Sequence, residues 1–129
     1  MSKIKETSTN FANKQALADE CPEVYAAHII GGQWALVICS WLINGKLRFG
    51  ELKKLLPNIT ERMLTLQLRK LEENKIIKRT IYAEVPPRVE YELTPIGYEL
   101  KAVIKQLESW GDKHKALDSA NSLNITKTN

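Results

Sequence analysis

The sequence predicts a mainly α-helical domain with a small β-hairpin, an α+β arrangement around one hydrophobic core. Apolar residues recur at three- and four-residue spacing through most of the chain, which is typical of helices packed on one face. This period changes to alternation within residues 77–93, as in a hairpin. The chain has 129 residues, of which 43% are hydrophobic and 26% charged, which suits one globular domain. We therefore expect a single domain over residues 11–117 between flexible tails, 1–10 and 118–129.

Two or three helices are expected before residue 45. A short helix over Phe11–Glu20 has only a thin apolar pattern. Pro22 favours the first turn of the next helix, because its missing N–H costs nothing there. Gly31-Gly32 should end that helix by supplying a positive φ. A further helix over Gln33–Ile43 then closes at the Asn44-Gly45 turn.

Residues 46–73 predict two helices joined by a tight turn. Residues 46–55 read as a very short extended piece followed by a short helix, which Pro57 stops. Thr60 is a good N-cap for the next helix, which should run to about Glu73. Its buried stripe is expected to consist of Leu64, Leu68 and Leu71, and its opposite face of Arg62, Leu66, Arg69 and Glu73, flanked by Thr65 and Lys70.

The hairpin is predicted from two alternating segments, Ile77–Tyr82 and Val89–Leu93. Between them, Ala83–Arg88 contains two adjacent prolines, which cannot donate to a sheet and which stiffen the connection. We expect this connection to be a projecting tip.

A long helix is predicted from about Pro95, with Thr94 as its cap. Its apolar stripe could cover the domain's own core, but a long helix after the hairpin has little core left to cover. We therefore expect this stripe to meet a partner helix in a homodimer. The expected interface residues are Leu100, Val103, Ile104, Leu107 and Trp110.

This element order is that of a winged helix-turn-helix, the hairpin being the wing. Formal net charge is −1 over residues 1–45, +6 over residues 46–88 and −1 over residues 89–129. A charged segment is often only a solvated face, but here it coincides with the helix-turn-helix and the wing. We therefore expect double-stranded DNA as the partner. The expected contacts are Thr60, Arg62, Thr65 and Arg69 on the recognition helix and Lys78, Arg79 and Arg88 on the wing.

Several strings together resemble the HxlR family of bacterial winged helix-turn-helix transcriptional regulators, which are MarR-like. They are Cys21-Pro22, Gly31–Trp34, Arg48–Leu52, Ile59–Leu64, Leu68–Glu72 and Val85–Thr94, the last reading VPPRVEYELT. The resemblance implies a cytoplasmic homodimer, joined through its first and last helices, on a palindromic operator. It also implies that Cys21 responds to oxidants or electrophiles. At the position of Gln33 the family commonly has Lys or Arg, so this residue departs from the family pattern.

Other readings remain open at this point. A helix N-terminus at Cys21 favours the reactive thiolate, but a passive thiol is the alternative. Cys39 lies inside a predicted apolar helix, so we expect its side chain to be buried and to pack as a small hydrophobic group. No spacing of cysteines and histidines indicates a metal site, and no motif indicates a cofactor or an enzyme. The longest apolar stretch, Trp34–Ile43, is too short to span a membrane. The alternative function is a winged-helix protein-interaction module without specific DNA binding.

Overall fold

The computed structural model describes residues 20–128, and side chains as far as residue 119. The chain divides into two compact units, residues 1–37 and 38–129. The predicted tail at residues 1–10 lies outside the described residues, as does all but the last residue of the predicted helix over Phe11–Glu20.

In the first unit, α2 (Pro22–Ile30) has the bounds that the sequence predicts, with Cys21 as its N-cap. Gly31 and Gly32, which follow this helix, are needed for different reasons. Only Gly32 has a positive φ, of 99°, whereas Gly31 has a φ of −64°, so the expectation of a positive φ at both was wrong. A Cβ at Gly31 would collide with the carbonyl oxygen of Ala27, and close backbone approach is therefore the reason for glycine there.

Helix α3 (Gln33–Leu42) begins in the first unit and ends in the second, one residue before the predicted end. Its second half supplies three fully buried side chains, Ile38, Cys39 and Leu42. The turn that follows places Gly45 at a φ of 142°, which a glycine adopts without steric cost.

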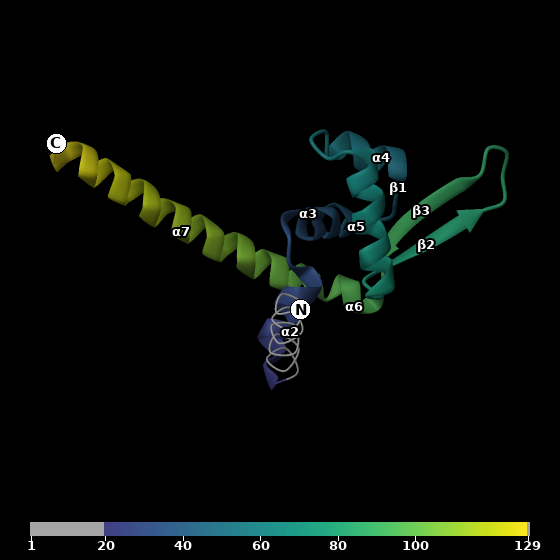
Figure 1. Ribbon diagram of the computed structural model, residues 1–129, viewed down its shortest axis with the longest axis horizontal. Coiled ribbons are helices and arrows are strands. Elements are labelled where there is room, and N and C mark those ends of the chain that lie inside the picture. The colour runs from purple at the N-terminus through teal and green to yellow at the C-terminus, as the bar shows by residue number, and fades with distance from the viewer. Residues whose placement is uncertain (1–19, 129) are drawn as a thin grey trace, which may run out of the picture. The chain divides into compact units, whose positions relative to one another are not determined.

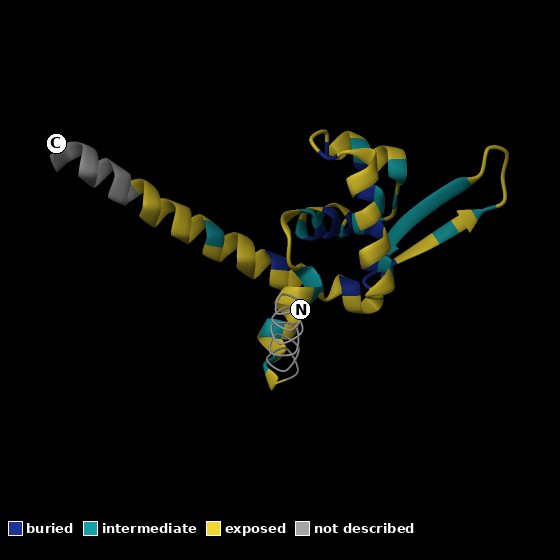
Figure 2. Ribbon diagram, in the orientation of Figure 1, coloured by how far each residue is buried: buried dark blue, intermediate teal, exposed yellow. Residues whose placement is uncertain are grey.

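The helix-turn-helix consists of α4 (Phe49–Leu55) and α5 (Glu61–Glu73). The hydroxyl oxygen of Thr60 accepts a hydrogen bond of 3.0 Å from the Met63 N–H, so Thr60 is the N-cap that the sequence predicts. Leucine side chains from both helices are buried in the core, and Figure 2 colours buried stretches of these helices dark blue. These leucines are Leu52, Leu64, Leu68 and Leu71.

The wing is part of a three-stranded antiparallel sheet in the order β1-β3-β2. Strands β2 (Ile77–Tyr82) and β3 (Arg88–Leu93) pair along their whole length. The short extended piece that the sequence predicts is β1 (Leu47–Arg48), and it joins the sheet beside β3. The connection between β2 and β3 projects beyond the helices of the second unit, as expected of a wing tip (Figure 1).

The predicted long helix is divided into α6 (Pro95–Tyr98) and α7 (Leu100–Thr128), with a turn at Glu99. The Thr94 hydroxyl accepts from the Gly97 N–H at 3.2 Å and lies 2.6 Å from the carbonyl oxygen of Lys75, to which it donates. These bonds fix α6 to the base of the wing. Helix α7 continues to Thr128, beyond residue 118, where we expected a tail to begin.

Among the described residues, no single helix has both the length and the apolar character needed to cross a membrane. Helices α2 and α3 reach that length and apolar character only when they are counted together, and the chain bends between them. The order of helices, short sheet and projecting hairpin is that of a winged helix-turn-helix.

Candidate nucleic-acid interface

The outer face of α5 is the first part of the site. The predicted stripe of Arg62, Leu66, Arg69 and Glu73 is exposed along the helix, opposite the buried leucines. None of the ion pairs between described residues involves Arg62 or Arg69. Two guanidinium groups, each with five donors and a permanent charge, are therefore presented to solvent from a helix whose other side is fixed in the core.

The two threonines of this helix are partly committed to its backbone. Thr60 uses its oxygen as the N-cap acceptor, which leaves its hydroxyl hydrogen for another partner. Thr65 is half-buried and donates its hydroxyl hydrogen to the carbonyl oxygen of Glu61 at 2.9 Å. Thr65 can still accept a hydrogen bond through its oxygen, whereas Thr60 can still donate one.

Two wing cations are held in exposed ion pairs. The Lys78 ammonium lies 3.7 Å from the carboxylate of Glu92 on the facing strand, and Arg79 Nε lies 3.7 Å from the carboxylate of Glu72 at the end of α5. The side chains of Lys78 and Arg79 are 65% and 46% exposed. Such pairs contribute about 0–1 kcal/mol, so either cation can exchange its carboxylate for a phosphate.

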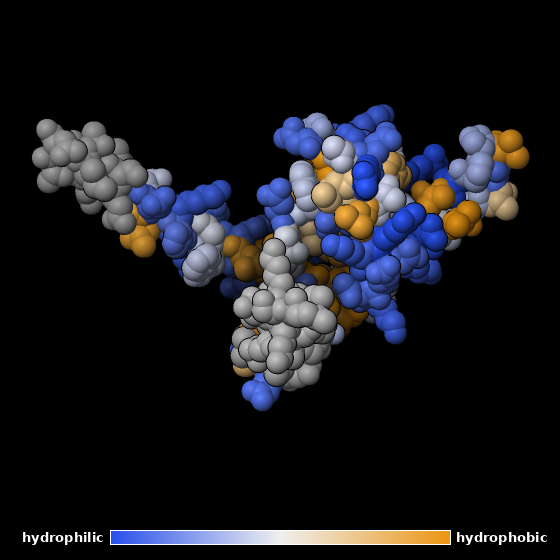
Figure 3. Space-filling model, in the orientation of Figure 1, coloured by the Kyte–Doolittle hydropathy of each residue, from blue (hydrophilic) through white to orange (hydrophobic). Residues whose placement is uncertain are grey.

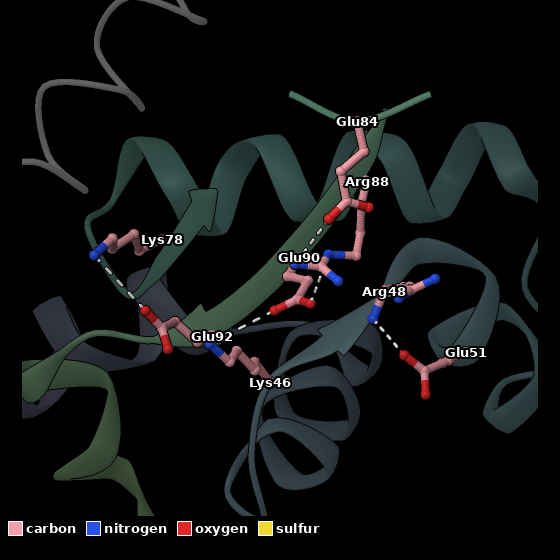
Figure 4. Close-up of polar contacts among 8 residues, drawn as sticks. All are labelled: Lys46, Arg48, Glu51, Lys78, Glu84, Arg88, Glu90 and Glu92. Carbon is pink, nitrogen blue, oxygen red and sulfur yellow. Dashed lines mark hydrogen bonds and ion pairs between the residues drawn. The ribbon is translucent and has the colours of Figure 1, made fainter. Parts of the chain in front are cut away.

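Arg88 is placed differently, inside a network of charges on the sheet. Its Nε lies 3.2 Å from the Glu90 carboxylate, its Nη2 lies 3.4 Å from that of Glu84, and its guanidinium stacks 4.2 Å from the centre of the Tyr82 ring. Lys46 approaches the second oxygen of Glu90 at 3.7 Å (Figure 4). The Tyr82 phenol and the carboxylates of Glu90 and Glu92 raise the pKa of Lys46 above its ordinary value.

The Arg88–Glu90 contact is an ion pair without hydrogen-bond alignment. Arg88 Nε and Glu90 Oε2 are buried atoms, and neither has a hydrogen-bond partner among the described residues. The side chains of Arg88 and Glu90 are only 28% and 15% exposed, so the pair is less screened by water than the pairs of Lys78 and Arg79.

The sheet does not bring the three predicted wing residues into one patch. Side chains alternate between the two faces of a sheet, and the register sets Lys78 opposite Glu92, Arg79 opposite Tyr91 and Arg88 opposite Tyr82. Arg79 therefore lies on the face that meets α5, while Lys78 and Arg88 lie on the other. Figure 3 shows hydrophilic side chains over most of the helix-turn-helix segment, and hydrophobic ones towards the end of the wing.

Sequence reasoning missed Arg48 and the acidic partners of the wing. Arg48 is exposed at the start of α4, and its backbone N–H donates to the Glu51 carboxylate at 2.9 Å. Its position in the basic segment was a signal that we did not use. Glu92, the partner of Lys78, could have been found by folding the hairpin at its prolines and reading which residues then face each other.

Helix α7 divides the predicted dimer residues into two groups. Ile104 is only 5% exposed and packs in the core of its own chain, so it offers little surface to a partner. Leu100 is half-buried. Val103, Leu107 and Trp110 are exposed, Trp110 to 65%, and they leave an apolar stripe along the helix. The Trp110 ring stacks on the His114 imidazole, with 5.2 Å between ring centres.

The two cysteines differ in environment. Cys21 is half-buried at the N-cap of α2, where its carbonyl oxygen accepts hydrogen bonds of 3.0 Å from the Val24 and Tyr25 N–H groups. Cys39 is buried in α3, and burial raises the pKa of its thiol to about 11. No group of three or more metal-ligating side chains occurs within the part of the chain that the structure describes.

Comparisons with known proteins agree with this architecture. Residues 29–119 match the family described as HxlR-like helix-turn-helix. YdeP of Bacillus subtilis, described as an uncharacterized HTH-type transcriptional regulator, is 50% identical over 95 residues, which cover 74% of each chain.

Two solved redox-related structures are also similar. The redox regulator HypR in its reduced form is 42% identical with a TM-score of 0.72, and the match covers 77% of this chain and 99% of HypR. Reduced YodB of B. subtilis is 35% identical with a TM-score of 0.66, over 72% of this chain and 92% of YodB. YodB has also been solved after diamide treatment and with quinone bound.

Proposed function

The chain belongs to the HxlR-like helix-turn-helix family of transcriptional regulators, and we propose that it binds a palindromic DNA operator as a homodimer through α5. The observation that supports this most directly is the outer face of α5. Arg62 and Arg69 are exposed there, and neither has an ion-pair partner among the described residues, on a helix fixed by buried leucines and by the Thr60 cap. A helix presented in this way fits the major groove.

Each residue has a distinct role in this proposal. Arg62 and Arg69 reach guanine edges or phosphates, because a guanidinium can donate two parallel hydrogen bonds to either. Thr65 accepts from a base, and Thr60 donates to a phosphate. On the wing, Lys78 and Arg79 exchange their exposed carboxylate partners for phosphates of the flanking backbone.

The second copy of the chain packs on the apolar stripe of α7. Val103, Leu107 and Trp110 are large apolar side chains at helical spacing, and all three are exposed in the single chain. A parallel or antiparallel partner helix would remove them from water and set two α5 helices at a fixed separation.

Cys21 makes the regulator responsive to oxidants or electrophiles. Its thiol is half-buried at the N-cap of α2, so it is more accessible to a reagent than the buried thiol of Cys39. The similar structures of HypR and YodB, one a redox regulator and the other solved with quinone bound, support this assignment.

The test is enrichment of genomic fragments by the purified, reduced protein at about 150 mM salt, where non-specific electrostatic binding weakens and specific binding survives. We expect an enriched palindrome whose half-sites are about one helical turn apart. The Arg62→Ala and Arg69→Ala variants should lose that enrichment, while Lys105→Ala, an exposed cation on α7, should keep it. If the wild-type protein shows no salt-dependent duplex binding, the protein-interaction module is the better description.

A further inference from the structure

An open groove of about 430 Å³ lies between the end of the wing and the start of α4. One wall is made by wing residues 84–89, and the other by Arg48, Phe49 and Gly50. Two arginines therefore line the groove, Arg48 from β1 and Arg88 from β3, and Glu84 lines it as well.

The two arginines differ in what balances their charge. Arg88 is 28% exposed and lies within 3.4 Å of two carboxylates, those of Glu84 and Glu90. Arg48 is exposed, and none of the ion pairs between described residues includes it. In Figure 4 the Arg48 side chain points away from the Arg88–Glu90 pair. Among the described residues that line the groove, Arg48 is therefore the cation without an ion-pair partner.

The backbone of Arg48 is fixed at two points. It pairs with Glu90 across β1 and β3, and its N–H donates to the Glu51 carboxylate at 2.9 Å. A guanidinium on an anchored backbone at the edge of a groove is suited to a phosphate oxygen, because contacts of this kind position a protein on DNA.

We propose that Arg48 makes the phosphate contact beside the wing, while Arg88 holds the wing tip in position and does not bind DNA. This rests on the proposed function, since it assigns residues to the same duplex. A phosphate at Arg88 would have to compete with the carboxylates of Glu84 and Glu90, which already balance its charge. Arg48 would give up no ion pair.

Arg88 acts as a positioning residue through its neighbours. Its guanidinium bridges Glu84 at the tip to Glu90 in the middle of β3, and its flat face covers the Tyr82 ring. Without Arg88, two carboxylates remain on one side of the hairpin, with Lys46 alone to balance Glu90. The wing tip would then lose the ion pairs that hold it to β3, and the wing side of the groove would lose its fixed position.

The test is the salt dependence of duplex binding, measured for the whole protein with the enriched operator fragment. The plot of log K against log salt has a negative slope, and 'slope' here means its magnitude. Each phosphate contact that is lost lowers this magnitude by about 1. We expect Arg48→Ala to lower the slope by about 1 with an unchanged melting temperature, and Arg48→Lys to restore the slope. Arg88→Ala should keep the wild-type slope, bind more weakly at every salt concentration and melt at a lower temperature. Arg88→Lys keeps the charge but not the planar stack, and should not restore the melting temperature.

Two results would overturn this assignment while leaving the proposed function intact. They are a wild-type slope for Arg48→Ala, or a slope lowered by about 1 for Arg88→Ala with an unchanged melting temperature. Lys105→Ala is the matched control for a cation outside the interface. If the wild-type protein does not bind a duplex at all, both this assignment and the proposed function fall.

Discussion

Arg79 Nε lies 3.7 Å from the carboxylate of Glu72, and this ion pair joins the last turn of the recognition helix to the first strand of the wing. The pair is the polar link between two elements that, in the proposed function, must meet the same duplex. Its partners are 46% and 39% exposed, so water and salt weaken it. Its contribution to stability is therefore small, and its effect should be seen mainly in how the wing is held.

A double-mutant cycle of Arg79→Ala and Glu72→Ala should give a coupling energy of at most about 1 kcal/mol in urea unfolding. Glu72→Gln alone should tighten duplex binding at low salt, because it frees the Arg79 charge for a phosphate. A coupling well above 1 kcal/mol would mean that the pair is more buried than its exposure indicates.

Arg69→Ala should change sequence preference at one operator position. A bidentate arginine–guanine contact contributes roughly 1–3 kcal/mol of discrimination, so the penalty for a substitution at that base pair should fall by this amount. Competition binding with single-base operator variants measures the change. Equal affinity and equal preference in Arg69→Ala and wild type would mean that another face of α5 meets the bases.

The α5 helix and the wing charges show how far sequence reasoning extends. The predicted buried stripe of Leu64, Leu68 and Leu71 is confirmed. It could be predicted because the spacing of apolar residues within one helix indicates which face is buried. The pairing of Arg88 with Glu90 was not predicted. The two residues are two apart on one strand and so share a face, but whether they pair also depends on the side chains that other segments bring to that face.

The same contrast holds at the end of the chain. The cap at Thr94 was predicted correctly, but the break at Glu99 follows from packing, since Gly97 lies against the backbone carbonyl of Ile76 and holds α6 there. Ile104 has the spacing of an interface residue, yet it is buried in its own chain. Periodicity shows which face of a helix is apolar, but not what covers each residue of that face.

If two chains pack on the α7 stripe as proposed, the dimer should be sensitive to a single charge there. Leu107→Asp should convert a dimer of about 29 kDa, twice the 14.7 kDa of one chain, into monomers at micromolar concentration in sedimentation experiments. Lys105→Asp, two residues away and also exposed, should leave the dimer intact. A Leu107→Asp protein that still sediments as a dimer would place the interface elsewhere.

Cys21→Ser should retain operator binding when diamide or a quinone releases the wild-type protein, because the variant lacks the thiol that reacts. Gel-shift titration with increasing diamide measures the release. Cys39→Ala should respond like the wild type, since its thiol is buried. The same release in Cys21→Ser and in the wild type would exclude Cys21 as the sensor.

Burial of Cys39 should also appear in the alkaline stability of the fold. The pKa of its thiol is raised to about 11 in the folded protein, whereas a thiol in an unfolded chain ionises near pH 8.5. Between these values the unfolded state binds fewer protons than the folded state, so the free energy of unfolding falls as pH rises. The loss reaches roughly 3 kcal/mol at most across that window, at about 1.4 kcal/mol for each pH unit.

Urea unfolding at several pH values between about 8 and 10 checks this. Cys39→Ala should be less stable at every pH, because it leaves a cavity, but its stability should decline less steeply. Tyr91, whose pKa is raised by burial, adds the same downward trend to both proteins. Parallel curves for the variant and the wild type would show that Cys39 does not contribute.

The strand order β1-β3-β2 has a consequence for handling the protein. Within the described residues it leaves β2 as an edge strand, where backbone groups can pair with another strand, and that strand carries Lys78 and Arg79. Charged side chains on an edge strand oppose edge-to-edge pairing between molecules. A variant that neutralises both cations to probe DNA binding would therefore also lose its protection against self-association, and its aggregation must be measured before any loss of binding is assigned to DNA.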